Sequence, residues 1–234
     1  QGYLEAVDYP DQDEFWAEVK ELSSSNEMDS DLAWMYKMLS SARGKVIFNK
    51  KMLMDYGAGI TLNPGVDKWF ERIRQFGYDH GIKVEHYIIS SGIKEMIEGT
   101  GPARDGAFTK LFASSFFYDE SGVAIWSAQA INYTNKTQCL FRISKGRLNM
   151  NDPGVNDYVP REEMRVPMRN MVYIGDSDTD IPCMKLVKSY GGHSIGVYDC
   201  ETGDRTKVCR MLNEGRISYY APADYSEGSE LDTL

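Results

Sequence analysis

Hydrophobic residues recur at helical spacing through the first sixty residues of the chain. Two stretches place apolar side chains on one helical face, first at Phe15, Trp16, Val19 and Leu22, and then at Leu32, Met35, Tyr36 and Leu39. Asp29 and Ser30 stand where the second helix would begin, and Gly57 and Gly59 close the region. The pattern predicts a helical N-terminal region.

A further helix is predicted directly after this region. Asn63 and Pro64 form a cap and first-turn pair. Apolar positions follow on one side of the expected helix at Val66, Trp69, Phe70, Ile73 and Phe76. The helix is expected to end between Gly77 and Gly81.

Beyond residue 83 the pattern changes to strands that alternate with helices. Apolar runs at 84–89, 171–174 and 193–199 predict strands, and 93–99 and 181–190 predict helices after the first two. Between the first strand and its helix, residues 90–92 predict a tight turn. Residues 112–134 predict a hairpin with its turn at 119–122. A short helix is predicted from Lys136 to Gly146, followed by a polar loop over 147–168. Such alternation is typical of a parallel α/β sheet that binds ligands at the carboxyl ends of its strands.

Composition limits the partners and the location of the protein. The 234 residues are 42% hydrophobic, enough for one large domain or for a core with a smaller companion. The 35 acidic and 26 basic residues give a net charge of −9 without a basic stripe, which argues against nucleic acid or an anionic membrane as the main partner. No run approaches the roughly 18 apolar residues of a membrane span, and no secretory signal pattern begins the chain. Four cysteines without a CxxC pair or zinc spacing suit free thiols in a reducing compartment, so we expect a cytoplasmic location.

The stretch NMVYIGDSDTD, residues 170–180, runs an apolar strand into three carboxylates. Asp176, Asp178 and Asp180 would repel one another without a cation or hydrogen-bond donors, so the stretch predicts a Mg²⁺ site at a strand end. A calcium loop of the EF-hand type is excluded, because Ile181 and Val187 stand where that loop needs Gly and Glu. Asp178 is interpreted either as an ordinary helix-capping aspartate or as a residue that faces solvent.

Two further strand ends carry groups suited to an anion. Ser90 and Ser91 supply hydroxyls, and the amides of Ser91 and Gly92 are predicted to open a helix N-terminus, an arrangement suited to a phosphate or another oxyanion. Lys136 supplies a compact positive charge. Taken alone, such a serine pair is more often a helix cap, and a single lysine is usually a surface charge. Donor, cation and metal together suit phosphoryl transfer, in which charge on the phosphoryl oxygens is neutralised.

The order of these groups resembles the haloacid dehalogenase-like superfamily, in particular its phosphoserine phosphatase-like branch. HYIISSG at Ser90 matches that family's second motif and TNKT at Lys136 matches its third. VYIGDSDTD matches the fourth motif at Gly175, Asp176 and Asp180, and the likeness runs over roughly 63–221. The resemblance implies a Rossmann-like parallel-sheet α/β core over 63–234 and a small α-helical cap domain over 1–62.

The resemblance also implies roles for the matched residues. Ser90, Ser91, Gly92 and Lys136 would bind phosphate, and Asp176 would hold Mg²⁺. Asp180 would be a second metal-shell carboxylate or the partner that orients Lys136. The implied function is a Mg²⁺-dependent phosphatase that hydrolyses a small phosphorylated metabolite through an aspartyl-phosphate intermediate.

The family's first motif, an apolar strand ending in DxDx[TV], does not occur in these residues. DQD at 11–13 is the nearest imitation, but it follows Tyr9 and Pro10 and leads into a helical stretch, so it is interpreted as a helix start. Because the chain begins with Gln1 rather than Met, we expect the motif upstream.

Other interpretations stay open at this point. A non-catalytic phosphate-ligand-binding or regulatory protein could keep the pocket without the nucleophile. A phosphotransferase or a dehalogenase of the same fold is the other alternative, and the second Asp of the first motif would be informative because dehalogenases lack it. A flavodoxin-like receiver domain fits less well, since such domains are about half this length.

Overall fold

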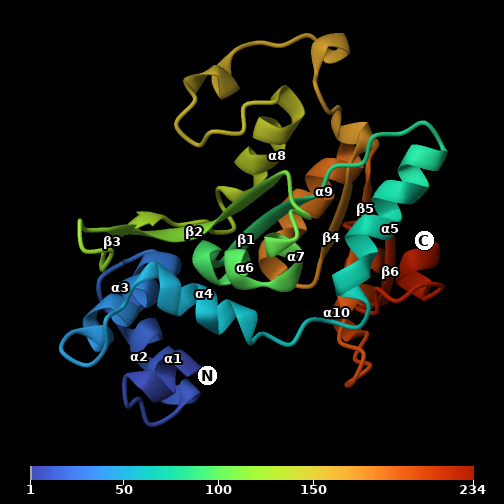
Figure 1. Cartoon of the computed structure of the whole chain (residues 1–234). Coiled ribbons are helices and arrows are strands. Elements are labelled where there is room, and N and C mark those ends of the chain that lie inside the picture. The colour runs from blue at the N-terminus through green and yellow to red at the C-terminus, as the bar shows by residue number, and fades with distance from the viewer. Residues whose placement is uncertain (1) are drawn as a thin grey trace. The chain divides into compact units, whose positions relative to one another are not determined.

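The computed structural model describes residues 2–234, which form two compact units (Figure 1). The first unit comprises residues 2–61 and 86–132, and the second comprises 62–85 and 133–234. The break after Thr61 lies beside the boundary expected at 62, whereas 86–132 group with the first unit rather than with the rest of the expected core. The assignment of 1–62 to a small α-helical cap domain stays a prediction.

The helices of the first unit are α1 (Gly2–Ala6), α2 (Gln12–Ser25), α3 (Ser30–Ala42), α4 (Lys50–Ala58), α6 (Lys94–Gly99) and α7 (Gly101–Arg104). Three of them, α2, α3 and α4, begin at side-chain caps that the sequence supplies. Asp11 accepts a hydrogen bond from the Glu14 amide at 2.7 Å, and Asp29 accepts from the Asp31 amide at 2.9 Å. The interpretation of DQD as a helix start is therefore confirmed.

The buried stripe of α3 differs from the predicted one. Met35 and Leu39 are buried as expected, but Leu32 is 39% exposed and Tyr36 is 46% exposed. The core instead takes Ala33, Met38 and Ala42 from this helix. Two overlapping sets of apolar positions fit the helical period in this helix, and the set predicted from the sequence is the more exposed of the two.

The first unit contains a three-stranded sheet in the order β1-β2-β3. Its strands are β1 (Tyr87–Ile93), β2 (Lys110–Tyr118) and β3 (Ala124–Gln129), with β1 parallel to β2 and β2 antiparallel to β3. The predicted hairpin is confirmed: the Asp119 carboxylate accepts hydrogen bonds from the amides of Ser121 and Val123, each at 2.9 Å. Gly122 adopts φ +78° in this turn, a conformation that favours glycine.

The second unit has alternating strands and helices, as predicted. Its sheet has the order β4-β5-β6 and is wholly parallel, with β4 (Val172–Gly175), β5 (His193–Tyr198) and β6 (Tyr219–Pro222). Its helices are α5 (Val66–Asp79), α8 (Lys136–Lys145), α9 (Ile181–Ser189), α10 (Thr206–Asn213) and α11 (Glu230–Thr233). Figure 1 shows the chain passing from β4 through α9 to β5 and on through α10 to β6.

The start of α5 corrects the prediction of a cap at Asn63 and Pro64. The helix begins at Val66, and Gly65 precedes it with φ +74°. A Cβ atom at Gly65 would lie 2.3 Å from the Ser226 amide nitrogen, so only glycine fits this turn. A contact with a residue so far along the chain leaves no local signal in the sequence.

The polar loop after α8 is ordered by cations of that helix. It contains the short 3₁₀ turns η1 (Pro153–Asn156), η2 (Arg161–Glu163) and η3 (Met168–Asn170). The buried Arg142 guanidinium donates to the carbonyls of Asn149 at 2.6 Å and Met150 at 2.7 Å. Among the helices of residues 2–234, none is long and apolar enough to cross a membrane.

Candidate functional site

A buried ion pair lies at the carboxyl end of β4. Lys136, the first residue of α8, places its Nζ atom 2.8 Å from Oδ1 of Asp180, which immediately precedes α9. The two residues are only 4% and 6% exposed. Because removing two charges from water is costly, such a pair persists only where further hydrogen bonds satisfy both groups.

The Asp180 carboxylate receives those hydrogen bonds on both oxygens. Oδ1 accepts from the Tyr173 hydroxyl at 2.8 Å as well as from Lys136. Oδ2 accepts from the Ser177 hydroxyl at 2.8 Å and the Ser177 amide at 3.2 Å. Burial by itself would raise the pKa of Asp180, but the hydrogen bond and charge of Lys136, with the Ser177 and Tyr173 donors, hold the pKa below its usual value. Asp180 is therefore an anion.

The Lys136 ammonium has a second partner. Its Nζ atom donates to the Thr179 hydroxyl at 3.0 Å, and Oγ1 of Thr179 lies 2.6 Å from the Ser177 hydroxyl. An ammonium carries three N–H donors, so the two partners within this unit leave one donor for an anion. This arrangement suits a cation that is held rigidly and presents one hydrogen bond to a ligand.

The local sequence explains why Asp180 folds back onto the end of β4. Ser177 and Asp180 form a capping box at the 3₁₀ turn η4 (Asp178–Asp180), each side chain accepting from the other residue's amide. A Cβ atom at Gly175 would lie 2.8 Å from Oδ2 of Asp180. Gly175 therefore provides the space that the Asp180 carboxyl group needs.

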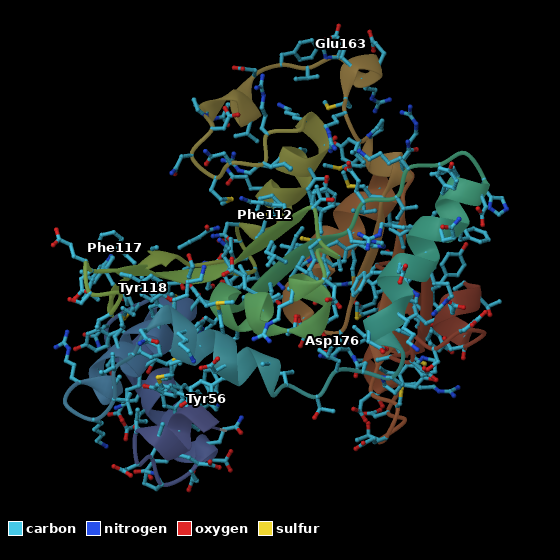
Figure 2. The ribbon with its side chains drawn as sticks, in the orientation of Figure 1. Tyr56, Phe112, Phe117, Tyr118, Glu163 and Asp176 are labelled. Atoms are coloured by element: carbon cyan, nitrogen blue, oxygen red, sulfur yellow. The ribbon has the colours of Figure 1, made fainter. Side chains whose placement is uncertain are left out.

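The other two aspartates of the stretch are exposed and differ in their partners. Asp176 follows β4 directly, and Figure 2 labels it there; the Lys207 ammonium donates to its main-chain carbonyl at 3.3 Å. The Asp178 carboxylate is 66% exposed and forms ion pairs with Lys207 at 3.7 Å and Arg210 at 3.8 Å. Asp178 thus faces solvent and the cations of α10, as one of its two interpretations expected.

A pocket of about 280 Å³ opens at the carboxyl ends of the strands of the second unit. Its lining includes the oxygen-bearing side chains of Asn63, Asp176, Asp199 and Tyr225. Burial and the charge of Asp176 raise the pKa of Tyr225 to about 12. Neither Asp199 nor Tyr225 was predicted from the sequence. Asp199 ends the predicted third strand, and this position at a strand end is the feature of the sequence that could have indicated it.

The oxygen atoms of the residues that line this pocket are compatible with Mg²⁺, which takes hard oxygen ligands and commonly keeps several waters. Within residues 2–234 no three His, Cys, Asp or Glu side chains are grouped to hold a metal ion. A magnesium ion here would therefore rely on one or two carboxylates, waters and ligand oxygens. Asp176 is the aspartate of the matched motif that lines the pocket.

The tight turn predicted at residues 90–92 is wrong, because these residues continue β1. The helix predicted at 93–99 is confirmed as α6, which begins at Lys94. The pairing with β2 shifts between Ser90 and Ile93, so a bulge takes up the intervening residues while the parallel pairing continues. The amides of Ser91 and Gly92 therefore do not form a helix N-terminus, and the Gly92 amide donates to the Ser90 hydroxyl at 3.0 Å.

The structure thus divides the predicted site residues between the two units. Lys136, Asp176 and Asp180 lie in the second unit, where Lys136 and Asp180 are in direct contact. Ser90, Ser91 and Gly92 lie in the first. Their role in phosphate binding stays a prediction.

The cysteines are free thiols, as expected. Burial raises the pKa of Cys139 to about 11 and that of Cys183 to about 12. A thiol that stays protonated is a poor nucleophile, so neither buried cysteine is a candidate for covalent catalysis.

The chain resembles solved structures of hydrolases, among them the following two. A HAD family hydrolase from Salmonella enterica serovar Typhi superposes with a TM-score of 0.57 at 16% identity, covering 98% of this chain and 67% of that one. A probable phosphoserine phosphatase from Vibrio cholerae superposes with a TM-score of 0.58 at 12% identity, covering 94% of this chain and 54% of that one. The chain thus spans about half the length of the Vibrio protein.

Sequence comparison adds one relative. An uncharacterized protein of Borreliella burgdorferi is 22% identical over 240 residues, covering 93% of this chain and 83% of the relative. No family model matches the chain. The structural likeness shows that the chain has the α/β fold of the haloacid dehalogenase-like hydrolases, similar to a phosphoserine phosphatase, which confirms the predicted fold class.

Proposed function

We propose that the protein is a Mg²⁺-dependent phosphatase that hydrolyses a small-molecule phosphomonoester through an aspartyl-phosphate intermediate. The observation that carries this proposal is the buried Lys136 ammonium, held by Asp180 and Thr179 with one N–H left for an anion. The fold supports it, since both solved neighbours are described as a hydrolase or a phosphatase. In a chain with a net charge of −9, a fixed cation also supplies the local attraction that a phosphate needs.

The roles follow from the chemistry of each group. Lys136 would donate its remaining N–H to the phosphoryl group and stabilise the charge that grows on its oxygens in the transition state. Asp180 would orient Lys136, because both of its carboxylate oxygens already accept hydrogen bonds from protein groups. This role is the second of the two that the sequence left open, and it leaves Asp176 as the proposed metal ligand. Ser90 would hydrogen-bond the transferred phosphoryl group.

A bound Mg²⁺ would neutralise charge on the phosphoryl oxygens. Asp176 would hold it at the end of β4, with waters and phosphate oxygens in the remaining positions. Lys207 donates to the main-chain carbonyl of Asp176 and so fixes the backbone that carries this carboxylate.

The nucleophile is the part of the mechanism to which no residue is assigned. An aspartyl-phosphate needs a carboxylate at the end of an apolar strand, and the sequence in hand contains no DxDx[TV] in that setting. The second candidate function is a regulatory protein that binds a phosphorylated ligand without turning it over, and it predicts a full reading frame without this motif.

One experiment separates the two. The protein expressed from its full reading frame is assayed with p-nitrophenyl phosphate, with and without Mg²⁺, and inorganic phosphate binding is measured by calorimetry. Hydrolysis that requires Mg²⁺ supports the phosphatase, whereas phosphate binding without hydrolysis supports the regulatory protein. Hydrolysis that survives a chelator would contradict the role of the metal.

A further inference from the structure

Tyr173 is a buried tyrosine whose hydroxyl lies beside the ion pair of Lys136 and Asp180. It lies within β4, it is only 8% exposed, and its neighbours along the strand are the apolar Val172 and Ile174. A buried tyrosine hydroxyl needs an acceptor, and this one donates to Oδ1 of Asp180 at 2.8 Å. The same oxygen accepts from Lys136 at 2.8 Å.

This geometry makes Tyr173 part of the support of the Lys136 ammonium. Ser177 holds Oδ2 of Asp180 with two donors, and Tyr173 holds Oδ1 beside Lys136. With donors on both oxygens the carboxylate group is fixed against rotation. Asp180 and Thr179 then fix two of the three N–H directions of Lys136, which determines where the third one points.

We propose that Tyr173 is a positioning residue, which acts through Asp180 to aim the free N–H of Lys136 at a bound phosphoryl group. The catalytic part of this inference rests on the proposed function; the geometric part does not. The alternative is that Tyr173 only fills the core beside β4. In that case, loss of its hydroxyl would change the stability of the protein but would change neither the position nor the hydrogen bonding of the Lys136 ammonium.

Tyr173→Phe is the test variant, because it keeps the ring and removes only the hydroxyl. Tyr3→Phe is the matched control. The Tyr3 hydroxyl is also buried and donates one short hydrogen bond, to the Met38 carbonyl at 2.6 Å, in the core of the other unit. Each substitution removes one hydrogen bond of a buried tyrosine hydroxyl, but only the bond lost in Tyr173→Phe is made to Asp180.

The first measurement is the lysine ammonium signal in ¹⁵N NMR spectra of the full-length protein, at one fixed pH and below the melting temperatures of all variants. The Lys136 signal is assigned with Lys136→Arg, and each variant is titrated with inorganic phosphate. We expect Tyr173→Phe to shift the Lys136 signal and to weaken phosphate binding by about tenfold, the usual scale for one hydrogen bond to a charged group. Tyr3→Phe should change neither. An unchanged Lys136 signal in Tyr173→Phe would overturn the inference.

The second measurement is a double-mutant cycle on phosphatase activity. Tyr173→Phe should lower kcat by about tenfold with a smaller change in KM, because the aimed charge counts most in the transition state. In the Lys136→Met background the same substitution should have little further effect. Equal losses in both backgrounds would overturn the inference. A wild-type protein without activity would contradict the proposed function instead, and the Lys136 signal would then decide the inference about Tyr173 by itself.

Discussion

Gly175 and Asp180 are matched in shape: a Cβ atom at residue 175 would lie 2.8 Å from Oδ2 of Asp180 and 2.9 Å from its Cβ. The buried carboxylate therefore exists in its present position because the strand ends in glycine. The contact links the main chain of β4 to the ion pair with Lys136. The effect of this contact on stability can be tested without any ligand.

Gly175→Ala should displace Asp180 and disturb its hydrogen bonds. We expect a loss of about 1–3 kcal/mol in the free energy of unfolding, the usual cost of forcing an extra methyl group into a packed site. Urea denaturation followed by fluorescence measures it. Gly101→Ala is the control, because a Cβ at that α7 position meets no atom within 4 Å and should not destabilise the protein. Equal midpoints for Gly175→Ala and the wild type would show that the contact relaxes without cost.

The Lys136–Asp180 pair should show strong coupling in stability. Lys136→Met and Asp180→Asn each leave one buried partner without its counterpart, which typically costs about 3–5 kcal/mol. In the double variant no unpaired charge remains, so its loss should be much smaller than the sum of the two single losses. Chemical denaturation of the four proteins completes the cycle. Additive losses would mean that the two charges do not interact in solution.

Two glutamates on α6 should give opposite pH dependences of stability. Burial raises the pKa of Glu95, so its contribution to stability is fully present at low pH and is lost as the pH rises through the folded-state pKa. Glu98 behaves in the opposite way. Burial by itself would raise its pKa, but Lys50 and Lys94 hold the pKa below its usual value, so its contribution is lost as the pH falls through the lowered value.

Melting temperatures recorded across the acidic to neutral range test this pair. Relative to wild type, Glu95→Gln should gain stability as the pH rises, because no buried carboxyl group has to ionise. Glu98→Gln should instead lose stability relative to wild type as the pH rises, because the charged partner of Lys50 and Lys94 is missing. Parallel curves for the two variants would contradict the assignment of opposite shifts.

The sequence predicted the elements that local patterns define and missed those that depend on distant contacts. The strand 171–174, the helix from Lys136 and the hairpin turn at 119–122 each have short-range signals in caps, glycines and apolar period. The bulge in β1 arises from pairing with β2, and the late start of α5 arises from the close approach of Ser226 to Gly65. Neither contact leaves a periodic pattern in the chain.

The same limit applies to the candidate site. Lys136, Asp176 and Asp180 could be singled out because their types and order match a known pattern. Tyr173 could not be singled out, because a large side chain inside an apolar strand is normally interpreted as a core residue. Only the structure shows that its hydroxyl donates to Asp180. Tyr225 lies beyond β6, a four-residue strand that was not predicted from the sequence. The hydrophobic pattern therefore gave no indication that Tyr225 lines the pocket.

Asp176 and Asp178 share one loop but have different surroundings. Asp176 lines the pocket, whereas the Asp178 carboxylate pairs with Lys207 and Arg210. If Asp176 holds Mg²⁺, the ion should raise the melting temperature of the wild type by ligand linkage. Asp176→Asn removes a full charge from the ligand and should abolish that rise, with an apo stability equal to or above that of the wild type.

Asp178→Asn is the matched control for this experiment. It makes the same chemical change two residues away, and its loss of two exposed ion pairs should cost no more than about 1 kcal/mol. Its Mg²⁺ response should stay close to that of the wild type. Scanning calorimetry of the three proteins with and without Mg²⁺ decides the matter: an undiminished response in Asp176→Asn would remove this carboxylate from the metal site. A larger loss of response in Asp178→Asn than in Asp176→Asn would assign the metal to Asp178 instead.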